Sequence, residues 1–143
     1  MYLIDTDVIS ELRKKDKADT GVRSFFDKIY LDQSPVFLSV VTVGELRRGV
    51  ELIRHRGDSQ QARKLESWLQ KLLTEHVEHI LPLDADSAQV WGRLRVPHPE
   101  NALDKQIAAT ALTHGLSVVT RNQRHYHGTG VSIVNPFASE AVR

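Results

Sequence analysis

Short apolar runs alternate with helical segments along the whole chain, and this alternation limits the folds that the chain can adopt. Each run is almost entirely apolar, which is typical of strands buried on both faces of a parallel sheet. Helices between such strands cover the two faces of the sheet. The expected fold is therefore α/β, a three-layer sandwich with a mostly parallel central sheet. The expected strands are Tyr2–Ile4, Val36–Leu38, Ile80–Leu83, Leu116–Thr120 and Val131–Val134.

The segments between these runs have the apolar spacing of amphipathic helices. Asp84 or Asp86 is expected to begin the helix that runs to Leu94. The helix richest in alanine is expected to end at Gly115, which is a suitable residue for a carboxyl-terminal cap. That helix is Ala102–Leu112, and the others are Asp7–Lys14, Val22–Leu31, Val43–Arg54 and Ser59–His76.

Length and composition indicate a single soluble domain over residues 1–143. Hydrophobic residues make up 41% of the chain and charged residues 26%, as is usual for globular proteins. There is no cysteine, which excludes a disulfide scaffold, a thiol nucleophile and a thiolate metal site. The net charge of +1 argues against a surface that is basic throughout.

Nothing in the sequence predicts contact with a membrane. The longest apolar stretch, Val36–Val43, is too short to span a bilayer and is interrupted by Ser39 and Thr42. Asp5 and Asp7 stand near the amino terminus in place of the basic region of a signal peptide. We therefore expect a cytoplasmic protein.

Three acidic residues fall where an α/β protein builds its active site. Asp5 directly follows the first expected strand, and Glu45 follows the second, near the start of the next helix. Asp104 stands at the start of the alanine-rich helix. Because the carboxyl ends of parallel strands lie at one edge of the sheet, these side chains can converge there. Mg²⁺ prefers carboxylate and water oxygens, so the pattern favours a divalent-cation site.

Each acid also has a purely structural interpretation. Asp5 and Asp104 stand where acidic side chains stabilise the amino-terminal end of a helix. Glu45 is placed to form an exposed ion pair with Arg48. Polar residues beside the strand ends favour the functional interpretation of the set. They are Ser39, Thr42, Thr120 and Asn122.

Four segments carry a more specific pattern. They are Leu3–Leu12, Ser39–Leu46, Asp104–Ala111 and Val118–Asn122. In this order and spacing they resemble the PIN-domain family, and specifically the VapC-type and FitB-like toxins of bacterial toxin–antitoxin pairs. Val134–Phe137 is also similar to the FitB-like ending, so the resemblance covers nearly the whole chain.

The resemblance implies an endoribonuclease that hydrolyses RNA phosphodiester bonds with Mg²⁺, or with Mn²⁺ as an alternative. By resemblance, Asp5 and Asp104 are metal ligands and Glu45 is the third catalytic acid. Thr6 and Thr120 match polar positions that hydrogen-bond this acid cluster. The family also implies a homodimer and a VapB-type antitoxin whose tail covers the site. The sequence does not identify the RNA target, the antitoxin or the number of metal ions.

Two positions depart from the family pattern. His125 stands where the family usually has a fourth acid, and no Asp or Glu occurs between Asp104 and Glu140. Asp7 stands where the family usually has Asn. We hypothesise that Asp7 partly restores the missing charge and that His125 shifts the metal preference toward Mn²⁺, since imidazole suits transition metals better. In the alternative, Asp7 caps the first helix and His125 is an ordinary loop residue.

Two other functions compete with this interpretation. A weakly active or inactive PIN module would bind RNA or an antitoxin and contribute to autoregulation of its operon. Leu3–Asp7 also resembles the Asp-x-Asp strand end of haloacid-dehalogenase-like phosphatases. That family needs a second acidic pair after a later strand, and the lack of acids between Asp104 and Glu140 counts against it.

Overall fold

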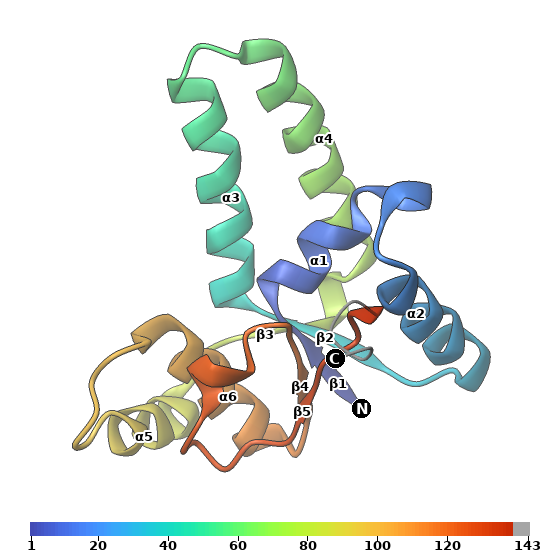
Figure 1. The fold of residues 1–143 in the computed structure, drawn as a ribbon. Helices are drawn as coiled ribbons and strands as arrows, with labels where there is room; N and C mark the ends of the chain where they lie inside the picture. Colours follow the sequence, from blue (N-terminus) through green and yellow to red (C-terminus); the bar gives the residue numbers. More distant parts are fainter. Residues whose placement is uncertain (139–143) are drawn as a thin grey trace.

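Five parallel strands form the sheet in the part of the chain that the computed structural model describes, residues 1–138. The strand order is β3-β2-β1-β4-β5, and every neighbouring pair is parallel. This result confirms the predicted α/β fold with a parallel central sheet (Figure 1). The strands are β1 (Tyr2–Ile4), β2 (Val36–Ser39), β3 (Ile80–Leu81), β4 (Ser117–Val119) and β5 (Ile133–Val134).

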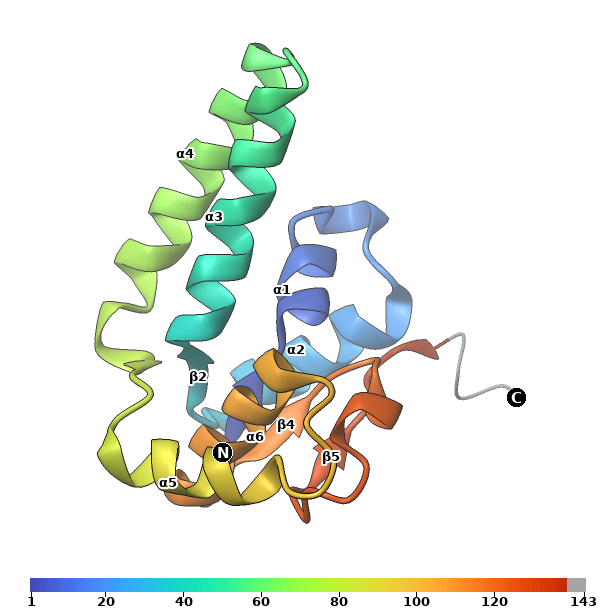
Figure 2. The same cartoon turned by 90° about the vertical axis from the view of Figure 1, so that its left-hand side faces the viewer.

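Helices connect the strands and lie on both sides of the sheet (Figure 1 and Figure 2). The predicted helices are all present, with ends that differ slightly from those expected. The α-helices are α1 (Thr6–Leu12), α2 (Thr20–Asp32), α3 (Val40–His55), α4 (Ser59–Glu75), α5 (Ala85–Leu94) and α6 (Ala102–His114). Short 3₁₀ segments, which were not predicted, are η1 (Lys15–Lys17), η2 (Val77–His79) and η3 (Gln123–Tyr126). Asp84, one of the two residues expected to begin this helix, caps the start of α5, and Gly115, with a φ of 66°, caps the end of α6 as predicted.

Two boundaries differ from the prediction for local reasons. α3 begins earlier than expected, at Val40, because the Ser39 hydroxyl caps it by accepting a hydrogen bond from the Val41 N–H at 3.0 Å. β3 ends earlier than expected, at Leu81, because Pro82 has no N–H to donate to the sheet. The first difference moves Glu45 further into the helix.

The core lies on both faces of the sheet. Neighbouring residues of a strand point to opposite faces, and β1 shows this clearly. Ile4 is fully buried in a cluster that includes Val8 of α1, whereas Leu3 is fully buried in a second cluster with residues of α6. In α6 the small side chains of Ala108 and Ala111 are also completely buried. Burial on both faces gives the three-layer arrangement that the alternating sequence predicts.

α3 and α4 form a long hairpin that extends away from the sheet (Figure 2). Arg47 and Arg54 of α3 both form ion pairs with Glu66 of α4, with N–O distances of 2.6 and 2.9 Å. Exposed pairs of this kind contribute less than about 1 kcal/mol each, so apolar contacts must provide most of the hairpin's stability. Trp68 supplies one such contact because it packs against the core. No helix within residues 1–138 has both the length and the apolar character needed to cross a membrane.

Candidate active site

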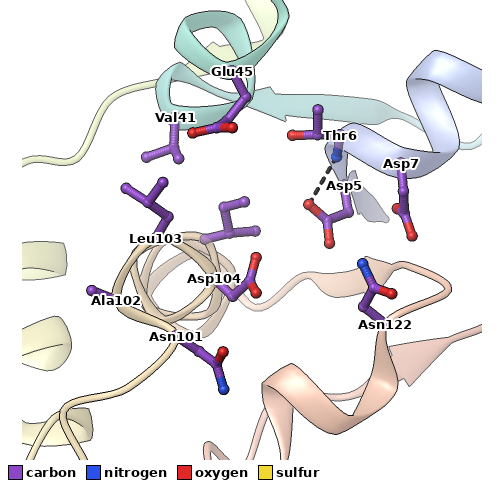
Figure 3. Close-up of a pocket in the computed structure, with 11 residues that line it drawn as sticks. Asp5, Thr6, Asp7, Val41, Glu45, Asn101, Ala102, Leu103, Asp104 and Asn122 are labelled. Atoms are coloured by element: carbon purple, nitrogen blue, oxygen red, sulfur yellow. Dashed lines mark hydrogen bonds between the residues drawn. The ribbon is translucent and has the colours of Figure 1, made fainter. Parts of the chain in front are cut away.

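A cleft of about 520 Å³ lies beside the carboxyl ends of β1 and β2. It is the edge of the sheet at which ligands usually bind in folds of this type. Asp5, Glu45 and Asp104 all line it, and Figure 3 shows their carboxylates directed into the same space. The lining residues are Asp5, Thr6, Asp7, Val41, Glu45, Asn101, Ala102, Leu103, Asp104, Ile107 and Asn122.

Asp5 is the most firmly held acid of the cleft. It follows β1 directly and is buried, with 4% of its surface exposed. Its Oδ1 accepts a hydrogen bond from the Thr6 N–H at 2.8 Å, which makes Asp5 the cap of α1. Its Oδ2 accepts two further hydrogen bonds, from Thr120 Oγ1 at 2.8 Å and from the Tyr126 hydroxyl at 2.9 Å. The capping interpretation is therefore confirmed, and the same side chain also lines the cleft.

Tyr126 is a site residue that the sequence did not reveal. It belongs to η3, is 2% exposed, and donates its hydroxyl hydrogen bond to Asp5. Burial and the negative charge of Asp5 raise the pKa of this phenol far above its ordinary range, so it remains a hydrogen-bond donor at neutral pH. The only sequence signal was a tyrosine near the polar residues that follow β4, and this signal is too general to indicate a contact with β1.

Asp104 extends into the cleft from the first turn of α6, on the side that faces Glu45 of α3 (Figure 3). Its Oδ2 lies 2.8 Å from Nδ1 of His125. Burial and the charge of Asp5 raise the pKa of Asp104, and His125 opposes this shift. The His125 ring therefore contacts an acid of the cleft, while its role there stays a prediction.

Asp7 also lines the cleft, but it does not cap α1. The cap is Asp5, and the Oδ2 of Asp7 instead accepts a hydrogen bond from the Arg121 N–H at 2.9 Å, which ties α1 to the loop after β4. The other oxygen, Oδ1, is buried and has no hydrogen-bond partner within the described residues. Burial, and then the charge of Asp5, raise the pKa of Asp7 to about 6. The capping alternative is therefore wrong for Asp7.

Glu45 lies in the second turn of α3 and points into the cleft (Figure 3). Its side chain is half-buried. The exposed ion pair with Arg48 that the helical spacing allows does not form. Glu45 therefore faces Asp5 and Asp104 with no cation from its own helix beside it.

The polar residues around the acids form a connected set. Thr120 donates its hydroxyl to Asp5 and also accepts a hydrogen bond from the Asn122 N–H at 3.0 Å. Asn122 lines the cleft with its side chain (Figure 3). Thr6 contacts Asp5 through its backbone N–H, while its hydroxyl donates to Thr42 Oγ1 at 3.2 Å. These contacts join the loop after β4 to the starts of α1 and α3.

The acids of the cleft repel one another. The negative charge of Asp5 contributes to raising the pKa of both Asp7 and Asp104. Within residues 1–138, no lysine or arginine forms an ion pair with Asp5, Asp7, Glu45 or Asp104. A bound cation would relieve this repulsion, since an opposite charge favours the ionised form of each carboxyl group.

The donor set fits a hard divalent cation. Mg²⁺ is usually held by one or two carboxylates and keeps several water ligands. The buried Oδ1 of Asp7 has no partner among the described residues, so an acceptor is left over beside this donor set. No group of three His, Asp or Glu side chains in the described part of the chain is arranged to hold one ion directly. A cation held by one or two of these carboxylates and several waters is compatible with this arrangement.

Comparison with known proteins identifies the class to which this fold and cleft belong. The sequence model of the PIN domain matches residues 2–130. Toxin FitB of Neisseria gonorrhoeae is 34% identical over 143 residues, which cover 96% of this chain and 99% of FitB. The VapC ribonuclease Y4jK of Sinorhizobium fredii is 31% identical over 145 residues, which cover 96% of this chain and 98% of Y4jK.

A solved structure shows the same architecture. The structure of FitAB bound to an IR36 DNA fragment contains a chain that superimposes with a TM-score of 0.81 at 30% identity. The match covers 95% of this chain and 95% of that chain. The parallel sheet with an acidic cleft at its carboxyl edge therefore defines a PIN-type α/β protein. The chain belongs to the PIN-domain family, and its resemblance to the VapC-type and FitB-like toxins is confirmed.

Proposed function

We propose that this chain is a metal-dependent endoribonuclease toxin that hydrolyses RNA phosphodiester bonds and is neutralised by a cognate antitoxin. The observation that carries the proposal is that Asp5, Glu45 and Asp104 line one cleft. The relatives support it, since they include a toxin and a VapC ribonuclease. The whole chain, residues 1–143, would act as one PIN domain.

Asp5 and Asp104 are the proposed ligands of the cation, which is Mg²⁺ or Mn²⁺. When bound, such a cation supplies a Lewis acid for the phosphate group and for the attacking water. Asp5 is already oriented by its hydrogen bonds, so it needs little rearrangement to act. Glu45 lines the cleft and has no ion-pair partner within the described residues, and in this proposal it would orient a water molecule there.

Three macromolecular partners follow from this proposal. RNA is the substrate, a VapB-type antitoxin covers the cleft, and a second copy of the chain completes a homodimer. The protein would work in the cytoplasm with no membrane partner. Light scattering of the purified chain measures the dimer directly. Co-purification with a co-expressed VapB-type antitoxin, followed by loss of RNA cleavage in the complex, tests the antitoxin.

Cleavage of labelled RNA by purified, partner-free protein tests the activity. The reactions contain Mg²⁺, Mn²⁺ or a chelator, and Asp5→Asn is tested beside the wild type. Asparagine also caps helices well, so this variant keeps the start of α1 while it removes the charge. We expect cleavage with either metal, none with the chelator, and none from Asp5→Asn.

A matched control distinguishes the effect of losing an acid in the cleft from the general effect of losing a negative charge. Asp27→Asn removes an exposed acid from α2, outside the cleft, and should cleave RNA as the wild type does. If folded wild-type protein cleaves none of several RNAs in either metal, the proposed activity is wrong. If Asp5→Asn cleaves as well as the wild type, the activity belongs to another site or to a contaminating nuclease.

One observation favours the alternative of a binding module. FitAB, whose matching chain is 30% identical to this one, is described in a complex with DNA, so a related chain takes part in a DNA-bound assembly. A weakly active or inactive module would bind RNA or antitoxin without cleaving RNA, and would contribute to autoregulation of its operon. RNA binding that is unchanged in Asp5→Asn, together with no cleavage by the wild type, would favour this alternative.

A further inference from the structure

Two consecutive residues of η3 each hold one of the two proposed metal ligands. His125 places Nδ1 at 2.8 Å from Oδ2 of Asp104, and Tyr126 donates its hydroxyl to Oδ2 of Asp5 at 2.9 Å. The two acids come from different elements, Asp5 from the end of β1 and Asp104 from α6. η3 is therefore the one short segment among residues 1–138 that contacts both carboxylates through side chains.

η3 is anchored firmly enough to act as a fixed support. The His125 N–H donates to the carbonyl of Asn122 at 3.0 Å, and the carbonyl of Tyr126 accepts the hydroxyl of Thr129 at 2.7 Å. Tyr126 also belongs to the core cluster that contains Leu3 and residues of α6. Because the aromatic ring is packed in the core, its hydroxyl can move little relative to β1.

In both hydrogen bonds the residue of η3 is the donor and the carboxylate is the acceptor. A tyrosine hydroxyl and an imidazole N–H both donate to a carboxylate, which fixes the plane of the carboxylate and selects which oxygen stays available. His125 engages Oδ2 of Asp104, so Oδ1 remains available for a cation. Partners of this kind are known to tune metal sites, and their loss typically weakens metal affinity about 10- to 100-fold.

We propose that His125 and Tyr126 are positioning residues that fix the spacing and orientation of Asp104 and Asp5, so that η3 sets the affinity of the cleft for a divalent cation. This inference rests on the proposed function, because it assumes that these two acids bind the cation. It gives His125 a different role from that of a metal ligand. His125 contributes a hydrogen bond to a ligand, and the atoms that reach the cation are all oxygens.

Mn²⁺ affinity measured by electron paramagnetic resonance tests the proposal without relying on catalysis. Tyr126→Phe removes only the hydroxyl, and His125→Leu removes the donor with a similar volume. We expect each to weaken Mn²⁺ binding by roughly tenfold. His125→Asn restores a donor nitrogen at the position of Nδ1 and should recover most of the affinity. Thermal unfolding curves of each variant show whether the fold is kept.

Exposed residues of the same types provide matched controls. Tyr30→Phe removes a hydroxyl from a tyrosine that is 83% exposed on α2. His127→Leu removes an exposed imidazole directly after η3. Both should bind Mn²⁺ as the wild type does. If Tyr126→Phe and His125→Leu also bind Mn²⁺ with wild-type affinity, the positioning role is wrong.

Electron spin echo spectroscopy distinguishes a positioning role from direct ligation. An imidazole nitrogen bonded to Mn²⁺ produces a nitrogen modulation of the echo, and we expect this modulation to be absent from the wild type. A modulation that disappears in His125→Leu would show that His125 binds the metal, which would overturn the proposal. Asp5→Asn distinguishes a failure of the proposed metal site from a failure of the positioning role. If it binds Mn²⁺ like the wild type, the metal site itself is misplaced. If it loses Mn²⁺ while the η3 variants keep it, only the positioning role fails.

Discussion

Thr120 donates its hydroxyl to Asp5 at 2.8 Å, although the two residues are 115 positions apart in the chain. The contact joins the end of β4 to the end of β1, which are neighbours in the sheet. It also lies in a fully buried environment, where a polar group that loses its partner is costly. The Asp5 carboxylate is therefore part of the fold as well as part of the candidate site.

Thr120→Val should lower the free energy of unfolding, because it removes one donor from a buried carboxylate without changing the size of the side chain. Hydrogen bonds to charged groups contribute roughly 1.5–3 kcal/mol, and we expect a loss of that order at pH 7. Urea denaturation measures it. Thr74→Val is the control, since the Thr74 hydroxyl bonds only to its own exposed helix. Equal losses in the two variants would contradict a special role for the buried contact.

Asp7 should make the stability of the metal-free protein depend on pH. Its pKa is raised from 3.8 to about 6, so between these values the folded state holds a proton that the unfolded state has lost. Stability therefore falls as the pH rises from about 4 to about 6, and the cost is complete above that range. Asp7→Asn removes this cost. It should stabilise the protein by about 1–2 kcal/mol at pH 7.5, after allowance for partial solvent exposure, and by little at pH 4.

Chemical denaturation at several pH values, with a chelator present, measures the effect of Asp7→Asn. Asp27→Asn is the control, and its effect should be small at every pH because the side chain is exposed. A stability difference between Asp7→Asn and the wild type that stays constant from pH 4 to pH 7.5 would show that the Asp7 carboxyl group does not titrate in this window.

Asp7→Asn should stabilise the metal-free protein but lower its affinity for a divalent cation. Asp7 adds negative charge beside Asp5, so Asp7→Asn should weaken Mg²⁺ binding by roughly tenfold. His125→Asp should strengthen Mg²⁺ binding, because the acid that it adds, where the family usually has one, outweighs the loss of the hydrogen bond to Asp104. Isothermal titration calorimetry with Mg²⁺ and Mn²⁺ measures both effects. If neither substitution changes either affinity, the hypothesis that these two positions tune the metal site fails.

Gly21 lies in the first turn of α2, and we expect that it cannot be replaced by alanine without loss of stability. The Oδ1 of Asp19 accepts hydrogen bonds from the N–H groups of Gly21 at 2.8 Å and Ala138 at 2.9 Å. A Cβ atom on Gly21 would collide with the carbonyl oxygen of Pro136 and the backbone of Ala138. Gly21→Ala should therefore destabilise the protein by about 1–3 kcal/mol, although alanine favours helices.

Gly92→Ala is the matched control, because a Cβ atom on this residue of α5 would meet no described atom within 4 Å beyond its chain neighbours and the backbone of its own helix. It should stabilise the protein by about 0.5–1 kcal/mol through the better helix propensity of alanine. Thermal unfolding of both variants gives the comparison. A Gly21→Ala protein as stable as Gly92→Ala would mean that the backbone of Pro136 and Ala138 does not pack on α2 as described.

The sheet and its helices could be predicted because the relevant signals are local. Apolar runs such as Tyr2–Ile4 and helical spacing such as that of Ser59–Glu75 are visible in the sequence. The convergence of Asp5 and Glu45 then followed from topology, since parallel strands end at one edge, whereas Asp104 stands at the start of α6 and follows no strand. Boundaries were less predictable, because a single cap at Ser39 or a single Pro82 decides them.

The contacts of η3 could not be predicted in the same way. A 3₁₀ turn of four residues has no apolar periodicity that would show its presence. The partners of His125 and Tyr126 lie on α6 and at the end of β1, far away in the sequence. Only the folded chain shows that the histidine in the fourth-acid position contacts Asp104.

A crystal of the partner-free protein soaked in Mn²⁺, with its anomalous scattering recorded, tests the central claim most directly. The claim is that the cleft between α1, α3 and α6 is a divalent-cation site. We predict an anomalous peak within bonding distance of carboxylate oxygens of both Asp5 and Asp104, with water molecules completing the coordination. A peak elsewhere on the protein, or no peak in the cleft at Mn²⁺ concentrations that saturate binding in solution, would contradict the claim.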